Sequence, residues 1–188
     1  MTTPPGKRRA TYQDLLDAPD TEIAEILDGE LFTSPRPRAR HALVHGNLHG
    51  LLHAPFHRGL GGPGGWWILF EQQLHLNQPE DVVVPDLAGW RRERMPEVPD
   101  EVEFRVPPDW VCEIVSPSTE RIDRTRKLRI YARAGVPFAW LVNPVARTLE
   151  AFRLEHGRWV LVEATGGEGT ARLEPFDAVE IDLTLVWE

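Results

Sequence analysis

Two carboxylates and one lysine are the residues of this chain best suited to catalysis. Asp86 ends one apolar segment, and Glu113 lies inside another, 27 positions later. Lys127 follows Glu113 by 14 positions and is one of only two lysines among 21 basic side chains. Lysine is a compact charge whose pKa falls readily when it is desolvated, whereas arginine stays protonated. A lysine at this place therefore suggests a need for an ammonium group, although chance or an i,i+4 pair with Asp123 would also explain it.

The position of Glu113 inside an apolar strand is costly unless its charge is satisfied. Along residues 110–115 the strand period of two places Glu113 on the same face as the valines two positions before and after it. A buried carboxylate survives when it is paired, hydrogen-bonded or bound to a metal. An ion pair with an arginine would explain Glu113 alone, but Asp86 and Lys127 together with it favour a metal site. Two carboxylates with water suit Mg²⁺, and Mn²⁺ is the alternative ion.

Length and composition indicate one globular domain. The chain has 188 residues, of which 41% are hydrophobic and 27% charged. We expect residues 1–10, which are polar and proline-rich, to form a flexible tail, and residues 11–188 to form a single domain. No segment resembles a secretory signal or a membrane span, so we expect a cytoplasmic protein without a membrane partner. The single cysteine, Cys112, excludes an internal disulfide and is expected in a strand core.

The net charge of −8 disfavours nucleic-acid binding but does not exclude it. Basic clusters occur at residues 36–40, 91–94 and 121–133, and a bound metal would add further positive charge. Such clusters are also typical of a solvated surface.

The order of predicted elements indicates a mixed α and β fold with helices against a central mixed sheet. Asp28-Gly29 between two apolar runs predicts an N-terminal β-hairpin. We expect helices at 12–16, 38–53 and 120–134, a glycine-rich connector at 59–65, and strands at 66–76, 82–90, 110–115, 138–142, 149–154, 159–163 and 179–183.

Five of the seven histidines recur every four residues, at His41, His45, His49, His53 and His57. A metal-binding row is one interpretation. Each step of four advances about 40° around an α-helix, however, so the row drifts off any single face. We therefore expect only His41 to reach an interior site, and the other four to lie on the solvated surface.

Three segments together resemble the Uma-two family of bacterial endonucleases, within the PD-(D/E)xK restriction-endonuclease-like superfamily. They are Pro85-Asp86, Glu113-Ile114-Val115-Ser116-Pro117-Ser118-Thr119, and residues 127–136, and the similarity runs from about residue 12 to 154. The resemblance implies a restriction-endonuclease-like core, Asp86 and Glu113 as metal ligands, and Lys127 as their positively charged partner. The superfamily pattern places a lysine two residues after the glutamate, where this chain has Val115, so the resemblance maps that lysine onto the following helix.

The resemblance adds two auxiliary candidates, His41 and Glu30. It also implies a homodimer, for which Trp66, Trp67, Trp90, Trp110 and Trp159 could supply an interface as well as a core. The predicted function is Mg²⁺-dependent hydrolysis of phosphodiester bonds in nucleic acid, most simply DNA. The alternatives are a catalytically inactive, homodimeric binding module on the nuclease fold, and a hydrolase of small phosphoesters.

Overall fold

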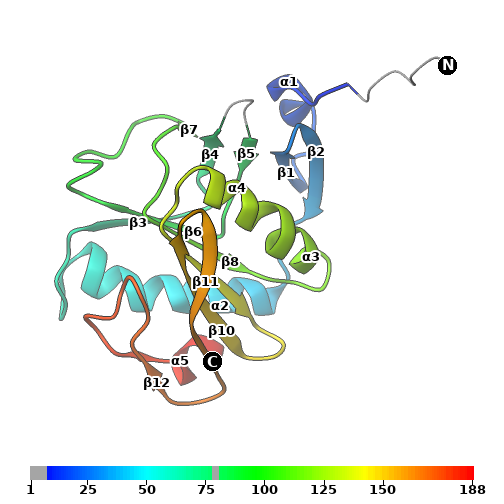
Figure 1. Cartoon of the computed structure of the whole chain (residues 1–188). Coiled ribbons are helices and arrows are strands. Elements are labelled where there is room, and N and C mark those ends of the chain that lie inside the picture. The colour runs from blue at the N-terminus through cyan, green and yellow to red at the C-terminus, as the bar shows by residue number, and fades with distance from the viewer. Residues whose placement is uncertain (1–7, 78–80) are drawn as a thin grey trace.

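The computed structural model describes residues 8–77 and 81–188, which form two larger β-sheets and a two-stranded ribbon, with helices around them (Figure 1). The larger sheet has the strand order β11-β10-β9-β8-β6-β3, with bounds β3 Trp66–Phe70, β6 Leu87–Arg91, β8 Trp110–Ile114, β9 Phe138–Asn143, β10 Thr148–Glu155 and β11 Arg158–Gly166. The second sheet has the order β2-β1-β5-β4-β7, with bounds β1 Glu22–Leu27, β2 Glu30–Pro35, β4 Gln73–Leu76, β5 Asp81–Val83 and β7 Glu103–Phe104. The remaining elements are α1 Tyr12–Leu16, α2 Ala39–Leu52, η1 His53–His57, α3 Glu120–Ile122, η2 Asp123–Lys127, α4 Leu128–Arg133, α5 Thr184–Trp187 and the two-stranded ribbon of β12 Thr170–Ala171 and β13 Ile181–Asp182.

The predicted mixed α+β architecture is confirmed. In the larger sheet β8 and β9 run parallel, while the other neighbouring strands run antiparallel. Parallel neighbours require a crossover connection, and here the helical segment from α3 to α4 supplies it. No helix in the described part of the chain is long and apolar enough to cross a membrane.

The N-terminal hairpin forms where the Asp-Gly pair predicts it. Asp28 and Gly29 have φ values of 55° and 80°, and Leu27 pairs directly with Glu30 across the turn. Both turn residues are thus left-handed, as a two-residue hairpin loop requires. The predicted tail falls mostly on residues 1–7, outside the described chain. Of its last residues, Ala10 is held to the hairpin, because its N–H donates to the Gly29 carbonyl over 2.8 Å.

Two segments predicted as single strands are each divided between the two sheets. The segment 66–76 breaks at Glu71, whose φ of 51° is incompatible with a continuous strand, and gives β3 and β4. The segment 82–90 breaks at Pro85, which has no N–H for a sheet ladder, and gives β5 and β6. The two breaks are adjacent, since the Glu71 N–H donates to the Asp86 carbonyl over 3.1 Å. Asp86 therefore lies at the junction of the sheets.

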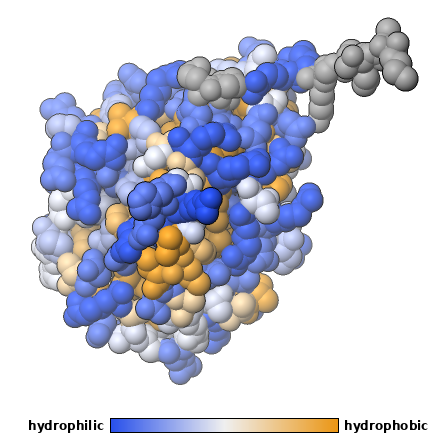
Figure 2. Space-filling model, viewed as in Figure 1, coloured by the Kyte–Doolittle hydropathy of each residue, from blue (hydrophilic) through white to orange (hydrophobic). Residues whose placement is uncertain are grey.

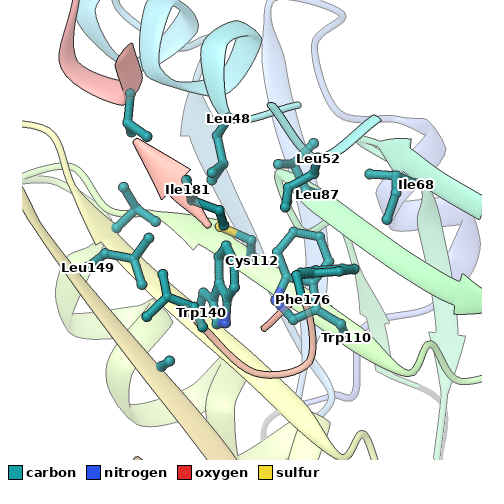
Figure 3. Packing of buried hydrophobic residues seen from close by; sticks show 14 of the residues in the cluster. Leu48, Leu52, Ile68, Leu87, Trp110, Cys112, Trp140, Leu149, Phe176 and Ile181 are labelled. Atoms are coloured by element: carbon teal, nitrogen blue, oxygen red, sulfur yellow. The ribbon is translucent and has the colours of Figure 1, made fainter. Parts of the chain in front are cut away.

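One face of the larger sheet packs against α2 and the C-terminal segment (Figure 3). Trp110, Cys112 and Ile114 of β8 point to this side, where they meet Leu48 and Leu52 of α2. Cys112 is fully buried, as expected of a core residue. The five tryptophans considered for a core or an interface all contribute to the core. Trp66, Trp90 and Trp110 are buried, and Trp67 and Trp159 are partly buried against the core.

The opposite face of β8 packs against the second sheet and α4. Val111 and Val115 lie in the cluster that contains Leu74 of β4 and Ile130 of α4. The predicted period of two is thus confirmed, and Glu113 is placed between the two sheets.

The helix predicted at 120–134 forms, but with a π-helical turn in its middle. This turn, η2, spans Asp123–Lys127, and Gly135 ends the helix with a φ of 76°. A π-turn inserts one residue into a helix and often marks a functional site. Here Asp123 and Lys127 are both buried.

The histidine row departs from the expectation of a solvated surface. All five rings are partly buried, and those of His45 and His49 contact Phe70 of β3 edge-on at 6.0 and 5.6 Å. The row does not drift away because α2 ends in the π-turn η1, which takes more residues per turn and rotates the last rings back towards β3. His57 then accepts a hydrogen bond at Nδ1 from the Ile68 N–H over 3.1 Å.

Candidate active site

Lys127 lies at the centre of a buried polar cluster between the sheets. Its Nζ lies 2.9 Å from Glu113 Oε2, 2.9 Å from Glu25 Oε1 and 3.0 Å from the Val84 carbonyl oxygen. These three acceptors use all three donors of the ammonium group. Burial lowers the pKa of Lys127, but the charges of Glu113 and Glu25 outweigh burial, so the pKa lies well above its usual value. The depressed lysine pKa that desolvation alone would produce is therefore absent, and Lys127 is a permanent cation.

Glu113 is fixed by two donors. Its Oε2 accepts from Lys127, and its Oε1 accepts from the Tyr131 hydroxyl of α4 over 2.5 Å. Burial raises the pKa of Glu113 well above its usual value; Lys127 opposes this shift, and the nearby charges of Asp123 and Asp86 add to it. The carboxylate thus lies where negative charge is already concentrated.

Asp86 lies at the edge of this cluster, and its side chain is 16% exposed. Its Oδ2 accepts from the Ile114 N–H over 2.6 Å, at the end of β8, and its Oδ1 lies 3.1 Å from His41 Nε2. Burial lowers the pKa of His41, but the hydrogen bond and charge of Asp86 outweigh it and raise that pKa above its usual value. His41 thereby orients Asp86 from the first turn of α2.

A cavity of about 610 Å³ opens onto these groups. Its walls come from β1, the start of α2, the end of β8 and the loop 116–119. Its lining includes all three residues of the predicted catalytic set, and the auxiliary candidate His41 as well. The charged and titratable residues of the lining are Glu25, Arg36, Arg38, Arg40, His41, Asp86, Glu113, Asp123 and Lys127.

Two acidic residues of the cavity, Glu25 and Asp123, were not singled out from the sequence as site residues. Glu25 bridges the sheets, because its Oε1 contacts Lys127 Nζ and also accepts from the Val84 N–H over 2.7 Å. It stands inside the apolar strand β1, which is the same signal that drew attention to Glu113. For Asp123 the sequence indicates only a helical pair with Lys127, and only the three-dimensional structure brings it to the cavity wall.

Glu30 is not brought into the site. It pairs with Leu27 across the hairpin, so it lies two positions towards the turn from the level of Glu25. Its carboxylate forms an ion pair with Arg126 at 2.9 Å and does not line the cavity.

The charge balance of the cavity fits a divalent cation. Four buried or half-buried carboxylates face the single lysine, whereas the three arginines of the lining are exposed. Burial together with the like charges of Glu25 and Asp86 raises the pKa of Asp123 to about 6, against the opposing effects of Lys127 and Thr119. An all-oxygen donor set suits Mg²⁺ or Mn²⁺. Across residues 8–77 and 81–188, no three His, Cys, Asp or Glu side chains are already arranged around a common metal position. Asp86 and Glu113 would therefore hold an ion with water or substrate oxygens completing its shell, as Mg²⁺ commonly accepts.

Comparison with known proteins agrees with this fold. A crystal structure described as that of a "putative nuclease belonging to DUF820", from Anabaena variabilis ATCC 29413, superposes with a TM-score of 0.75 over 95% of this chain and 97% of that chain, at 17% sequence identity. This likeness shows that the two chains share a fold. No curated protein matches the chain in sequence. The model of the Uma2 family, described as "Putative restriction endonuclease", matches residues 9–185. Because this match spans almost the whole sequence, the chain belongs to the Uma2 family of restriction-endonuclease-like proteins.

Proposed function

We propose that this protein is a Mg²⁺-dependent endonuclease that hydrolyses phosphodiester bonds in DNA, with Mn²⁺ as an alternative ion. The observation that carries the proposal is the meeting of Asp86, Glu113 and Lys127 at one cavity, although they are widely separated in sequence. Membership of a family described as endonucleases supports the same reaction class.

Each residue has a role that follows from its contacts. Asp86 and Glu113 are the proposed metal ligands, since each carboxylate oxygen keeps a lone pair beyond its present hydrogen bond. A bound divalent ion would supply the positive charge that activates water and stabilises the phosphate in the transition state. Lys127 holds Glu113 in place and contributes its own charge, while His41 orients Asp86.

The test is Asp86→Asn, which keeps the volume of the side chain and its acceptor for the Ile114 N–H. We expect Mg²⁺-dependent cleavage of plasmid DNA to fall at least about 100-fold, as when a charge-stabilising group is removed from an active site. Circular dichroism and the melting temperature should change little, because Asp86 lies at the cavity surface. Glu30→Gln is the matched control, since Glu30 lies outside the cavity. Full cleavage by Asp86→Asn would rule out the assignment.

A non-catalytic binding module on the same fold is the second candidate. The engagement of all three Lys127 donors within the protein and the net charge of −8 favour it. Titration calorimetry with Mg²⁺ and Mn²⁺ separates the two, because only the enzyme requires ion binding that is lost in Asp86→Asn. DNA, RNA and small phosphoesters assayed in parallel would distinguish a nuclease from a small-molecule hydrolase.

A homodimer and a cytoplasmic location are further parts of the proposal. Trp66, Trp90 and Trp110 are buried within the chain and are not available for an interface. The exposed Val160 and Leu161 of edge strand β11 are the better surface, and Figure 2 shows apolar side chains gathered over the β10–β11 hairpin. Light scattering of the protein and of Leu161→Glu would measure the mass and its dependence on this strand.

A further inference from the structure

Three arginines form one wall of the cavity that holds the carboxylates. Arg36, Arg38 and Arg40 follow one another between the end of β2 and the first turn of α2, and all three line the cavity. We refer to these three residues as the arginine wall. Their side chains are exposed, whereas Glu113 and Lys127 beneath them are buried.

The backbone of this segment is set by proline. Pro35 and Pro37 alternate with the arginines, and proline fixes φ, removes a donor and favours extended geometry in the residue before it. Arg36 and Arg38 are therefore presented on an extended strip that does not join a sheet ladder beyond Pro35, and Arg40 follows in the first turn of α2.

Helix α2 begins directly after this strip and adds unpaired donors to the same wall. Its N-cap is Arg38, and no side chain caps the helix. The first N–H groups of a helix have no intrahelical partner and carry partial positive charge. Arg40 and His41 belong to this first turn and both line the cavity.

The arginine wall has no acidic partner within the described chain. In the described chain Arg38 and Arg40 make no ion pair or side-chain hydrogen bond, and Arg36 donates only to the Asp20 carbonyl, over 3.1 Å. By contrast, Arg124 pairs with two glutamates. Acidic residues outnumber basic ones by 29 to 21, so pairing partners are plentiful. What distinguishes the three arginines is that they lie together on one cavity without an acidic partner, so their guanidinium groups are available to an external anion.

We propose that the arginine wall binds the backbone phosphates next to the scissile one and thereby holds a polynucleotide over Asp86 and Glu113. This inference rests on the proposed nuclease function and specifies its substrate class. A single phosphate is repelled by the four carboxylates of the cavity, so a substrate needs a second, cationic anchor. The planar guanidinium groups of arginine bind phosphate oxygens in pairs and suit this role. The substrate is thus a chain with phosphates on either side of the cleaved bond, and not a mononucleotide ester.

The experiment compares two triple variants with the same loss of charge. Arg36→Gln, Arg38→Gln and Arg40→Gln together remove the arginine wall. The control combines Arg58→Gln, Arg147→Gln and Arg158→Gln, which are exposed residues outside the cavity with no ion pair in the described chain. Both sets are placed in the Asp86→Asn background, which prevents turnover. Binding of a fluorescent DNA duplex is measured by anisotropy between 50 and 200 mM salt.

Loss of the wall should weaken binding at least about 10-fold at low salt. It should also flatten the plot of log K against log salt by about 0.9 for each phosphate contact removed. The control triple should keep the slope of the parent. In the otherwise native chain, the wall variant should raise KM for DNA, whereas the control triple should keep the KM of the parent.

The outcomes separate this inference from the proposed function. Cleavage by the native chain with equal binding slopes for both triples would overturn the arginine wall and leave the nuclease intact. Wall-dependent binding without any cleavage by the native chain would overturn the nuclease and retain the wall. Absence of both binding and cleavage, on DNA and on RNA, would overturn both.

Discussion

Asp123 is the residue for which burial has the clearest energetic consequence. Burial is the main cause that raises its pKa from 3.8 to about 6, and the like charges of Glu25 and Asp86 contribute. A carboxyl group whose pKa is higher in the folded protein favours folding when it is protonated, and this advantage is lost as the pH rises through about 6. Above that pH the ionised group costs about 3 kcal/mol.

Asp123→Asn should therefore stabilise the ion-free protein. We expect the free energy of unfolding to rise by about 2–3 kcal/mol at pH 7.5, and to change little at pH 4, where aspartate is largely protonated in the fold. Urea unfolding at both pH values measures the difference, and Glu163→Gln on the exposed part of β11 serves as the control. A loss of stability at pH 7.5 would show that attraction to Lys127 outweighs burial.

At the residue scale, the sequence predicts those site residues whose type is unexpected among their neighbours in the sequence. Glu113 is detectable because it interrupts an apolar strand, and Lys127 because lysine is rare in this chain. Tyr131 and Asp123 give no such signal, since tyrosine and aspartate are ordinary in a helix. Their part in the site depends on how the helix lies on the sheet, and no local pattern encodes that position.

At the scale of elements, the histidine row makes the stability of the packing of α2 depend on pH. Burial, with repulsion from His53, lowers the pKa of His49 and of His57 below the usual value. A histidine with a lowered pKa supports folding above its unfolded pKa, about 6.5, and this support is lost as the pH falls through that value and below. His41 has the opposite shift and so partly compensates at low pH.

Replacing the central part of the row should reduce the acid sensitivity of the protein. Between pH 7.5 and 5.5 the melting temperature of the double variant His49→Gln, His53→Gln should fall less than that of the parent. The reason is that fewer neighbouring imidazole rings would become charged. His156→Gln in the β10–β11 turn is the control. Differential scanning fluorimetry across this range is sufficient, and identical losses in all three proteins would contradict the prediction.

Most elements could be predicted from the sequence, but their division between sheets could not. The hairpin at Asp28 and the helix ending before Gly135 follow from turn and capping chemistry that acts within a few residues. The breaks at Glu71 and Pro85 move the chain between sheets, and Glu71 has no glycine-like signal for its left-handed φ. The π-turns escaped prediction for a related reason, since one inserted residue hardly changes the hydrophobic period.

At the scale of the whole molecule, the C-terminal segment completes the core of the larger sheet. Phe176 is fully buried, and its ring centroid lies 4.9 Å from those of Trp66 and Trp110 and 5.6 Å from that of Trp140. Figure 3 shows Phe176 beside Trp110 and Trp140. The sequence predicted only a strand at 179–183 here, because an isolated phenylalanine carries no periodicity.

Phe176→Ala should destabilise the protein strongly. Loss of a large aromatic side chain from a packed core costs about 3–5 kcal/mol, through lost burial and the cavity that remains. Leu161→Ala, at a side chain that is 50% exposed, should cost less than about 1 kcal/mol. Urea unfolding of the two variants measures both values, and similar midpoints would show that the segment is not an integral part of the core.

The contacts of Lys127 have a consequence for the mechanics of the molecule. Glu25 belongs to one sheet, Glu113 to the other, and the Val84 carbonyl to the strand break between them. One ammonium group therefore connects the two sheets and also places a positive charge in the cavity between them. A neutral side chain at this position would weaken the contact between the sheets and also remove a positive charge from the cavity. A defect in such a variant therefore combines a loss of rigidity with a loss of reactivity.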